Sequence, residues 1–402
     1  MALAELLRTR RVLVTVGAGG VGKTTTAAAL AVAAAREGRR VLCLTIDPAK
    51  RLAQSLGFEK IDQEAAVVDA KRFADAGVEL KGSLTVMMLD TKRTFDELVV
   101  KYSSSPAKAK QLLENRLYKY MSGSLAGTQE YMAVEKLVAV KDDPAYDLVL
   151  LDTPPTSNAL DFLDAPERLM DALDSSTMKW FVEAFETSGK FSLNLLAKSA
   201  EVVLKAMGRI TGGGFLEAMA EFISQLNELF GGFKQRAQMV QKALRSDDVA
   251  FILVTSPAPM SLREVIYFAE RLEEHQMPMG AFVVNRIHTV PPGPNRVAKE
   301  PEIVTAIVKN RIMLEDEGPK RIARAHKEQF TLAQIDERHL RALGGVSKTG
   351  APVVRIPELA SDVHDIELLA QIGDLLVSGG VPPAPPSRRS IPVATDPGRG
   401  GE

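Results

Sequence analysis

A glycine-rich loop near the amino terminus has the residue types and spacing to bind the phosphates of a nucleotide. Gly17, Gly22, Lys23 and Thr24 fill the pattern GxxxxGK(S/T). Glycine has no Cβ, so backbone N–H groups can approach phosphate oxygens. The lysine can reach the terminal phosphates, and the threonine hydroxyl can bind Mg²⁺. The pattern predicts a Mg²⁺–nucleoside triphosphate site made by Gly17, Gly19, Gly20, Val21, Gly22, Lys23, Thr24 and Thr25.

The elements on either side of this loop fit the same function. An apolar run at 12–16 is of strand length, and the alanine-rich segment from Thr24 to Glu37 predicts a helix that Gly38 ends. The positive end of that helix would point at the bound anion. A strand, a loop and a helix in this order are the context that the pattern requires, which argues against an accidental glycine-rich turn.

Further apolar runs of strand length recur along the chain, at 41–46, 84–89, 148–151, 250–255, 281–284 and 353–356. Helical segments separate them, which predicts an α/β fold with a doubly wound, mainly parallel sheet covered on both faces. Ligands of such sheets bind at the carboxyl ends of the strands. Asp47, Asp152 and Asn285 each follow one of these runs, so we expect them at the nucleotide site.

Two stretches, about 94–140 and 165–245, are too long and too helical to be simple crossovers. We interpret both as a helical subdomain inserted into the α/β core. The second contains an apolar helical face between Phe215 and Phe230. Internal packing is the simpler interpretation of this face, and a groove for an apolar client is the alternative. Residues 312–342 predict a charged, solvated helix on the rim.

Composition restricts the function classes. The chain of 402 residues has 50 Lys and Arg against 51 Asp and Glu, so we expect no nucleic-acid partner. One cysteine, Cys43, excludes an intrachain disulfide and CxxC metal or redox motifs. The five histidines lack metal-binding spacing. We find no run long enough to span a bilayer and no signal-peptide pattern, so we expect a cytoplasmic protein.

Three further motifs narrow the prediction. Asp47-Pro-Ala-Lys-Arg-Leu52 follows the second expected strand, Asp152-Thr-Pro-Pro-Thr156 follows a later one, and Asn285 ends the run at 281–284. Together with the loop, they make the chain resemble the ArsA-type ATPases over most of residues 8–375. That family includes arsenite-pump ATPases and ATPases that target tail-anchored membrane proteins. The resemblance implies a P-loop NTPase of the deviant Walker A class, which we expect over 1–378. The segment 379–402 is rich in Pro and Gly with little to bury, which predicts a disordered tail.

The resemblance also implies roles for individual residues. Asp47 would be the switch I carboxylate that orients or deprotonates the attacking water, and Lys23 would act with it in catalysis. Asp152 would hold Mg²⁺ through water, beside Thr24. Asn285 would read the adenine base, and Pro357 would belong to the loop beside it. The implied cofactors are ATP and Mg²⁺.

The sequence departs from the family pattern at three places. The signature lysine of the family's GKGGVGKT loop, which crosses a dimer interface to the partner's phosphates, is Ala18 here. The cysteines that bind arsenite, and the CxxC pair that holds a dimer through zinc, are absent. The segment after Asp152 reads Thr156-Ser-Asn158 where the targeting ATPases have Thr-Gly-His. Loss of a cation that stabilises transition-state charge should slow hydrolysis unless another group replaces it.

The leading hypothesis is therefore a Mg²⁺-dependent ATPase whose ATP-driven dimer switch serves transport or delivery of a client. The expected partners are an identical or paralogous ATPase subunit, with a hydrophobic client or a membrane transporter. The first alternative is a positioning ATPase of the MinD/ParA type. We rank it lower, because such proteins generally lack the long helical insertion and the tail here has no apolar helical face. The second alternative, motivated by Ala18, is a weakly hydrolysing nucleotide-binding subunit.

Overall fold

The computed structural model describes residues 2–46, 56, 65–115, 118–119, 122, 128–153, 164, 171, 222, 235–289, 296–312, 317–341, 343 and 350–380. Within these residues the core is an eight-stranded sheet in the order β3-β4-β2-β5-β1-β6-β7-β8. The strands are β1 (Val12–Val16), β2 (Arg40–Thr45), β3 (Ala66–Val67), β4 (Ser83–Met88), β5 (Leu148–Asp152), β6 (Val249–Thr255), β7 (Met279–Ile287) and β8 (Val353–Pro357).

The sheet is parallel except at one edge, where β3 pairs with β4 in the antiparallel direction. The strand β1 lies between β5 and β6, with Thr15 opposite Asp152 and Val16 opposite Leu253. The carboxyl ends of these three strands therefore meet where the chain leaves β1 for the glycine-rich loop. This arrangement confirms the predicted doubly wound, mainly parallel α/β fold.

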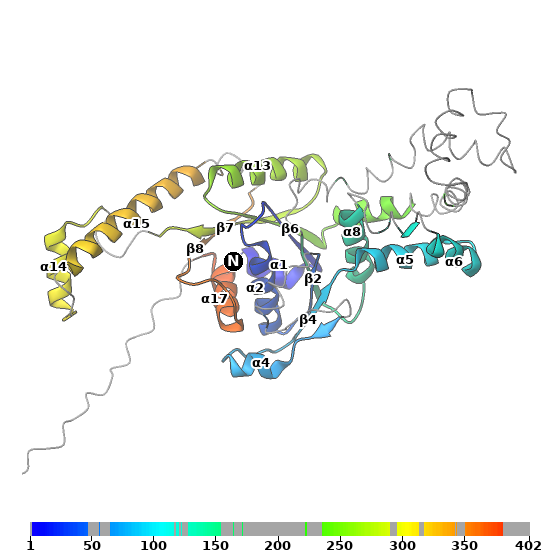
Figure 1. Ribbon diagram of the computed structural model, residues 1–402, viewed down its shortest axis with the longest axis horizontal. Helices are drawn as coiled ribbons and strands as arrows, with labels where there is room; N and C mark the ends of the chain where they lie inside the picture. The colour runs from blue at the N-terminus through cyan, green and yellow to red at the C-terminus, as the bar shows by residue number, and fades with distance from the viewer. Residues whose placement is uncertain are drawn as a thin grey trace, which may run out of the picture.

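Helices cover both faces of the sheet (Figure 1). The described helices are α1 (Ala2–Thr9), α2 (Lys23–Arg36), α4 (Ala70–Asp75), α5 (Thr91–Tyr102), α6 (Pro106–Glu114), α8 (Thr128–Lys141), α13 (Pro259–Glu274), α14 (Glu300–Lys309), α15 (Gly318–Leu340) and α17 (Ile366–Ser378). One hydrophobic cluster joins the sheet to α1, α2 and α17, and a second joins the opposite face to α8 and α13. None of the described helices is long and apolar enough to cross a bilayer.

The helix that follows the loop is deeply enclosed. All nine residues from Ala27 to Ala35 are buried. On α17, a Cβ at Gly373 would lie 2.9 Å from the carbonyl oxygen of Ala29, so glycine permits the two helices to pack very closely. Asp365 caps the amino end of α17, since its carboxylate accepts the N–H of Leu368 at 2.8 Å, and Gly379 with φ of 85° caps the other end.

The sequence predictions for the remaining segments have different outcomes. The described parts of the first stretch include α5, α6 and α8, and its interpretation as an inserted subdomain stays a prediction. Of the second, a helix over 235–244 and a few single residues are described, and the Phe215–Phe230 face lies outside the described residues except for Phe222, which is buried. The rim helix is α15, which with α14 extends away from the sheet (Figure 1). The tail beyond 380 is also outside the described residues.

Asn285 requires a correction. It does not end its strand, because β7 continues to Ile287. Val284 is opposite Arg355 and Ile287 is opposite Pro357, so two residues of β7 face one residue of β8. Arg286, the second of the pair, has φ of 58°. This is a β-bulge, which bends the strand and re-aims the side chains on it.

Candidate nucleotide site

The glycine-rich loop is fitted against β6 and β7. Gly17 has φ of 153°, and a Cβ there would collide with the carbonyl oxygen of Val254 in β6. Gly22 has φ of 100°, and a Cβ there would collide with the side-chain amide of Asn285 in β7. Glycine is therefore required at both positions, for backbone conformation and for space. The result is a loop with its backbone close to the sheet, at the amino end of α2, as an anion cradle requires.

Lys23 lies inside this cradle. Its side chain is 6% exposed, and its ammonium donates to the carbonyl oxygens of Gly17 and Ala18, each at 2.9 Å. The charge is thus held over the loop by backbone groups of the loop itself. An ammonium in this place can interact with the outer phosphates of a nucleotide whose inner phosphates the loop binds.

Oxygen ligands converge beside the cradle at the end of β5. Thr24, in the first turn of α2, donates its hydroxyl to Asp152 Oδ2 at 2.7 Å. Thr45, the last residue of β2, donates to the same oxygen at 3.2 Å. Asp152 is fully buried. Hydroxyl and carboxylate oxygens are the ligands that Mg²⁺ prefers, so this donor set fits the predicted ion.

Thr45 is not among the residues that we predicted for the site. The signal is present in the sequence, because a threonine follows the apolar run Val41–Leu44 at the carboxyl end of the strand. Its significance depends on β2 and β5 being neighbours, with Thr45 directly opposite Asp152. Strand order cannot be obtained from a single strand's sequence.

Asn285 lies against the loop. Its amide donates to the carbonyl oxygen of Val21 at 3.0 Å, and its side-chain carbonyl accepts the backbone N–H of Arg286 at 2.9 Å. Pro357 is opposite Ile287 at the end of the neighbouring strand β8. The structure therefore brings Asn285 and Pro357 to the same edge as the loop. Their predicted contacts with adenine stay a prediction.

Asp47, Lys50, Arg51 and the segment 154–158 lie outside the described residues. The preceding residue, Ile46, donates its N–H to the carbonyl oxygen of Asp152 at 3.4 Å. The chain therefore enters the Asp47 segment directly beside Asp152. Thr153 follows on the other side and donates its hydroxyl to the carbonyl oxygen of Thr15 at 2.7 Å, which fixes the end of β5 to β1.

Comparison with known proteins agrees with this geometry. The family model described as "Anion-transporting ATPase" matches residues 10–299. This chain belongs to the anion-transporting ATPase family. ATPase get3 of Aspergillus terreus is 24% identical over 91% of this chain and 90% of its own length. ATPase GET3 of Ajellomyces dermatitidis and ATPase GET3 of Blastomyces gilchristii are similar to the same degree, with 24% identity over 91% of this chain and 90% of theirs.

The family assignment confirms the predicted ArsA-type resemblance and an ATP-hydrolysing enzyme. The family description implies a nucleotide substrate, and the assignment of ATP to the glycine-rich loop stays a prediction. The roles of individual loop residues, and of Asp47, Asp152, Asn285 and Pro357, remain predictions.

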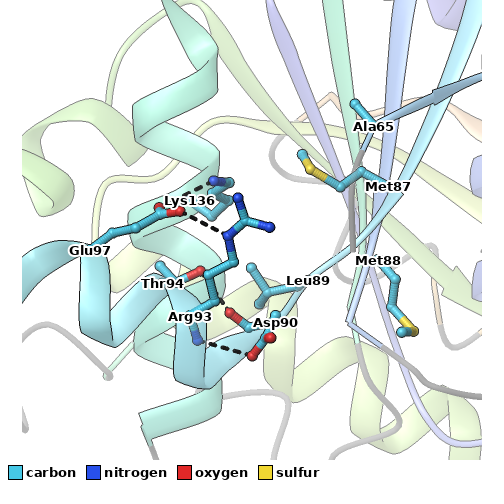
Figure 2. A pocket seen from close by; sticks show the side chains of 9 residues that line it. All are labelled: Ala65, Met87, Met88, Leu89, Asp90, Arg93, Thr94, Glu97 and Lys136. Carbon is cyan, nitrogen blue, oxygen red and sulfur yellow. Dashed lines mark hydrogen bonds and ion pairs between the residues drawn. The ribbon is translucent and has the colours of Figure 1, made fainter. Parts of the chain in front are cut away.

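The ATPase has a separate hollow at the carboxyl end of β4 (Figure 2). Its volume is about 230 Å³, and no residue of the glycine-rich loop lines it. Glu97 of α5 lies between two cations, 3.4 Å from Arg93 and 3.4 Å from Lys136 of α8, as Figure 2 shows. The charges are mixed and mutually paired, so the hollow does not resemble a phosphate site.

A neighbouring cavity of about 360 Å³ contains a buried ion pair. Arg236, in the helix over 235–244, lies 2.6 Å from Glu135 of α8, and their side chains are 14% and 4% exposed. Burial raises the pKa of Glu135, and the charge of Arg236 opposes that rise. The pair joins the helix that precedes β6 to the helix that precedes β5.

Cys43 is fully buried in β2, within the cluster that also contains α2. Burial raises the pKa of its thiol, and the charge of Asp152 adds to the rise. Among the described residues, no three His, Cys, Asp or Glu side chains gather as a metal-ligand set.

Proposed function

We propose that this ATPase binds Mg²⁺–ATP in the glycine-rich loop and uses its hydrolysis to switch a dimer that delivers a client or energises a transporter. The observation that carries the nucleotide site is the loop fitted against Val254 and Asn285, with Lys23 in its cradle and Thr24 beside Asp152. The delivery role is supported by the family resemblance alone.

The proposed reaction transfers the terminal phosphoryl group of ATP to water. A bond forms between the water oxygen and the γ-phosphorus, the bond from that phosphorus to the β,γ-bridging oxygen breaks, and Asp47 accepts the proton of the water. The N–H groups of the loop and of the first turn of α2 hold the phosphates, and Lys23 offsets the charge on the γ-phosphate. Mg²⁺, when bound by Thr24 and through water by Asp152, would supply further neutralisation of phosphate charge.

The proposed domain organisation is one ATPase domain over 1–378 with the helical insertion, followed by the tail over 379–402. The end of α17 at Ser378, with Gly379 in a left-handed conformation, supports the boundary.

The test of nucleotide binding is Lys23→Ala, measured by titration with a fluorescent ATP analogue and by phosphate release. We expect measurable binding or turnover to be lost, because the variant removes the only side-chain cation that the described part of the loop offers to phosphate. Lys92→Ala is the matched control, since Lys92 lies on α5 and pairs with Asp96. A Lys23→Ala protein with unaltered affinity and rate would reject the assigned site.

The test of the dimer switch is the mass of the protein in solution, measured by light scattering with no nucleotide, with ADP and with a non-hydrolysable ATP analogue. We expect the mass to depend on the nucleotide. If the mass is the same in all three states and Lys23→Ala still abolishes hydrolysis, the dimer switch is rejected. The proposed ATPase activity would then stand.

A further inference from the structure

The last turns of α15 contact three neighbouring strands or the residues that follow them. Asp336 contacts His288, the residue after β7, and Glu337 forms an ion pair with Arg355 of β8 at 2.9 Å. The ring of His339 lies 3.1 Å from the carbonyl oxygen of Pro257, just after β6. The other end of the same helix belongs to the projecting arm formed by α14 and α15 (Figure 1). One helix therefore connects the arm to the edge of the sheet that carries the nucleotide site.

Four consecutive residues link the glycine-rich loop to this helix. Asn285 donates to Val21 in the loop, and Arg286 completes the bulge with its positive φ. The carbonyl of Ile287 accepts the N–H of Glu358 at 2.9 Å. His288 then contacts α15. The segment therefore contains Asn285, the residue expected to read adenine. It is also hydrogen-bonded, through Ile287, to Glu358, the residue after β8.

Asp336 holds His288 by two contacts at one carboxylate oxygen. The backbone N–H of His288 donates to Asp336 Oδ2 at 2.8 Å, and the ring Nδ1 of His288 lies 2.8 Å from the same oxygen. The other ring nitrogen lies 3.3 Å from Glu358 Oε2. Asp336 is 6% exposed. The nearly buried carboxylate of Asp336 thus contacts His288 twice. The imidazole ring of His288 lies between Asp336 of α15 and Glu358, the residue after Pro357.

We propose that Asp336 and His288 are positioning residues that set the base-binding end of the nucleotide site. The inference rests on the proposed function, because it assumes that ATP binds with its adenine beside Asn285 and Pro357. A bulge with a residue at positive φ keeps its shape only when its surroundings hold it. Asp336 provides that support from α15 through His288, and the contact of His288 with Glu358 ties the segment to the residue after β8. A small displacement of Asn285 would misalign its amide with the base while the phosphate cradle stays intact.

The experiment compares the binding of ATP, which has an adenine base, with the binding of a polyphosphate that has no base. Dissociation constants are measured for ATP and for inorganic tripolyphosphate, the latter by competition with a fluorescent ATP analogue, in the wild type, in Asp336→Asn and in His288→Gln. We expect both variants to bind ATP about tenfold more weakly, the loss expected when one hydrogen bond to the base is misplaced. Tripolyphosphate affinity and kcat at saturating ATP should be unchanged, so KM rises alone.

The control and the opposing outcomes separate this inference from a structural effect. Glu328→Gln is the matched control, because Glu328 lies on α15 and pairs with Arg324 on the same helix. Its affinities should equal those of the wild type. Equal losses for ATP and tripolyphosphate, or no loss for either, would overturn the positioning role. Because Asp336 is buried, His288→Gln, whose site is 25% exposed, decides the question if Asp336→Asn does not fold. Failure of the proposed function is distinguishable, since the wild type would then bind neither ligand through Lys23.

Discussion

The hydroxyl of Thr24 donates to Asp152 Oδ2 at 2.7 Å, which joins the first turn of α2 to the last residue of β5. A hydroxyl that binds a cation through its oxygen must direct its hydrogen away from that cation. The contact between Thr24 and the carboxylate would therefore leave the Thr24 lone pairs available for the predicted Mg²⁺. Asp152 would then orient a ligand of the ion, in addition to its expected bond through water.

Asp152→Asn should weaken Mg²⁺–ATP binding by about tenfold or more, the usual effect of removing an orienting partner of a metal ligand. Binding of ATP in excess EDTA should change much less, because the loop and Lys23 are untouched. The comparison is two titrations of the same variant, with and without Mg²⁺. Equal losses in both would show that Asp152 supports the fold rather than the ion. Asp147→Asn, at an exposed ion pair with Arg40, is the control.

Asp47→Asn should reduce turnover far more than nucleotide affinity. A carboxylate that positions or deprotonates the attacking water contributes mainly in the transition state. Single-turnover phosphate release and a direct binding titration separate the two quantities. If turnover stays near that of the wild type, Asp47 only terminates its strand.

Ala18→Lys should increase the turnover of the isolated protein, by at least about tenfold, if the missing trans cation limits hydrolysis. Ala18→Met is the control for side-chain length without charge. Two natural substitutes are possible: Lys50 or Arg51 of the same chain, or a paralogous subunit that carries the lysine. Unchanged turnover in Ala18→Lys, together with unchanged turnover in Lys50→Ala and Arg51→Ala, would defeat the missing-charge hypothesis and the local substitute.

Arsenite and antimonite should not stimulate hydrolysis. Soft metalloids bind clustered thiolates, whereas this chain has one thiol, fully buried and with a raised pKa. Turnover is measured with and without sodium arsenite in the wild type and in Cys43→Ser. Stimulation that survives Cys43→Ser would contradict the requirement for thiolate ligands. Stimulation that is lost in Cys43→Ser would show that arsenite reaches the buried thiol, and it would also contradict the prediction.

Arg236→Met should destabilise the protein by about 3 kcal/mol, because it leaves the carboxylate of Glu135 buried without its partner. The double variant Glu135→Leu, Arg236→Met should recover most of that loss, since apolar side chains of similar size can replace a buried pair. Denaturant unfolding of the wild type, Arg236→Met, Glu135→Leu and the double variant gives the coupling between the two sites. A single variant as stable as the wild type would mean that solvent or another cation compensates Glu135.

The sequence predicted those parts of the site whose residues are adjacent to one another along the chain. The loop from Gly17 to Thr25, the strand before it and the helix after it are local patterns, and the structure has this strand and helix as expected. The contact of Thr45 with Asp152 joins residues 107 positions apart, so it exists only because β2 and β5 are adjacent. The contact of His288 with Asp336 spans 48 positions and a projecting arm. The bulge at Arg286 follows from the pairing of β7 with β8, which apolar runs cannot reveal.

The close approach of Gly373 to Ala29 has a consequence for how the enzyme can move. Tightly packed interiors resist small displacements, because any shift of α2 would meet a helix on one side and the sheet on the other. We therefore expect α2 to keep its position relative to the sheet when a nucleotide binds and leaves. Any nucleotide-dependent movement should then occur in other segments of the chain. A larger residue in place of Gly373 would displace α2 and disturb the proposed phosphate site at its amino end.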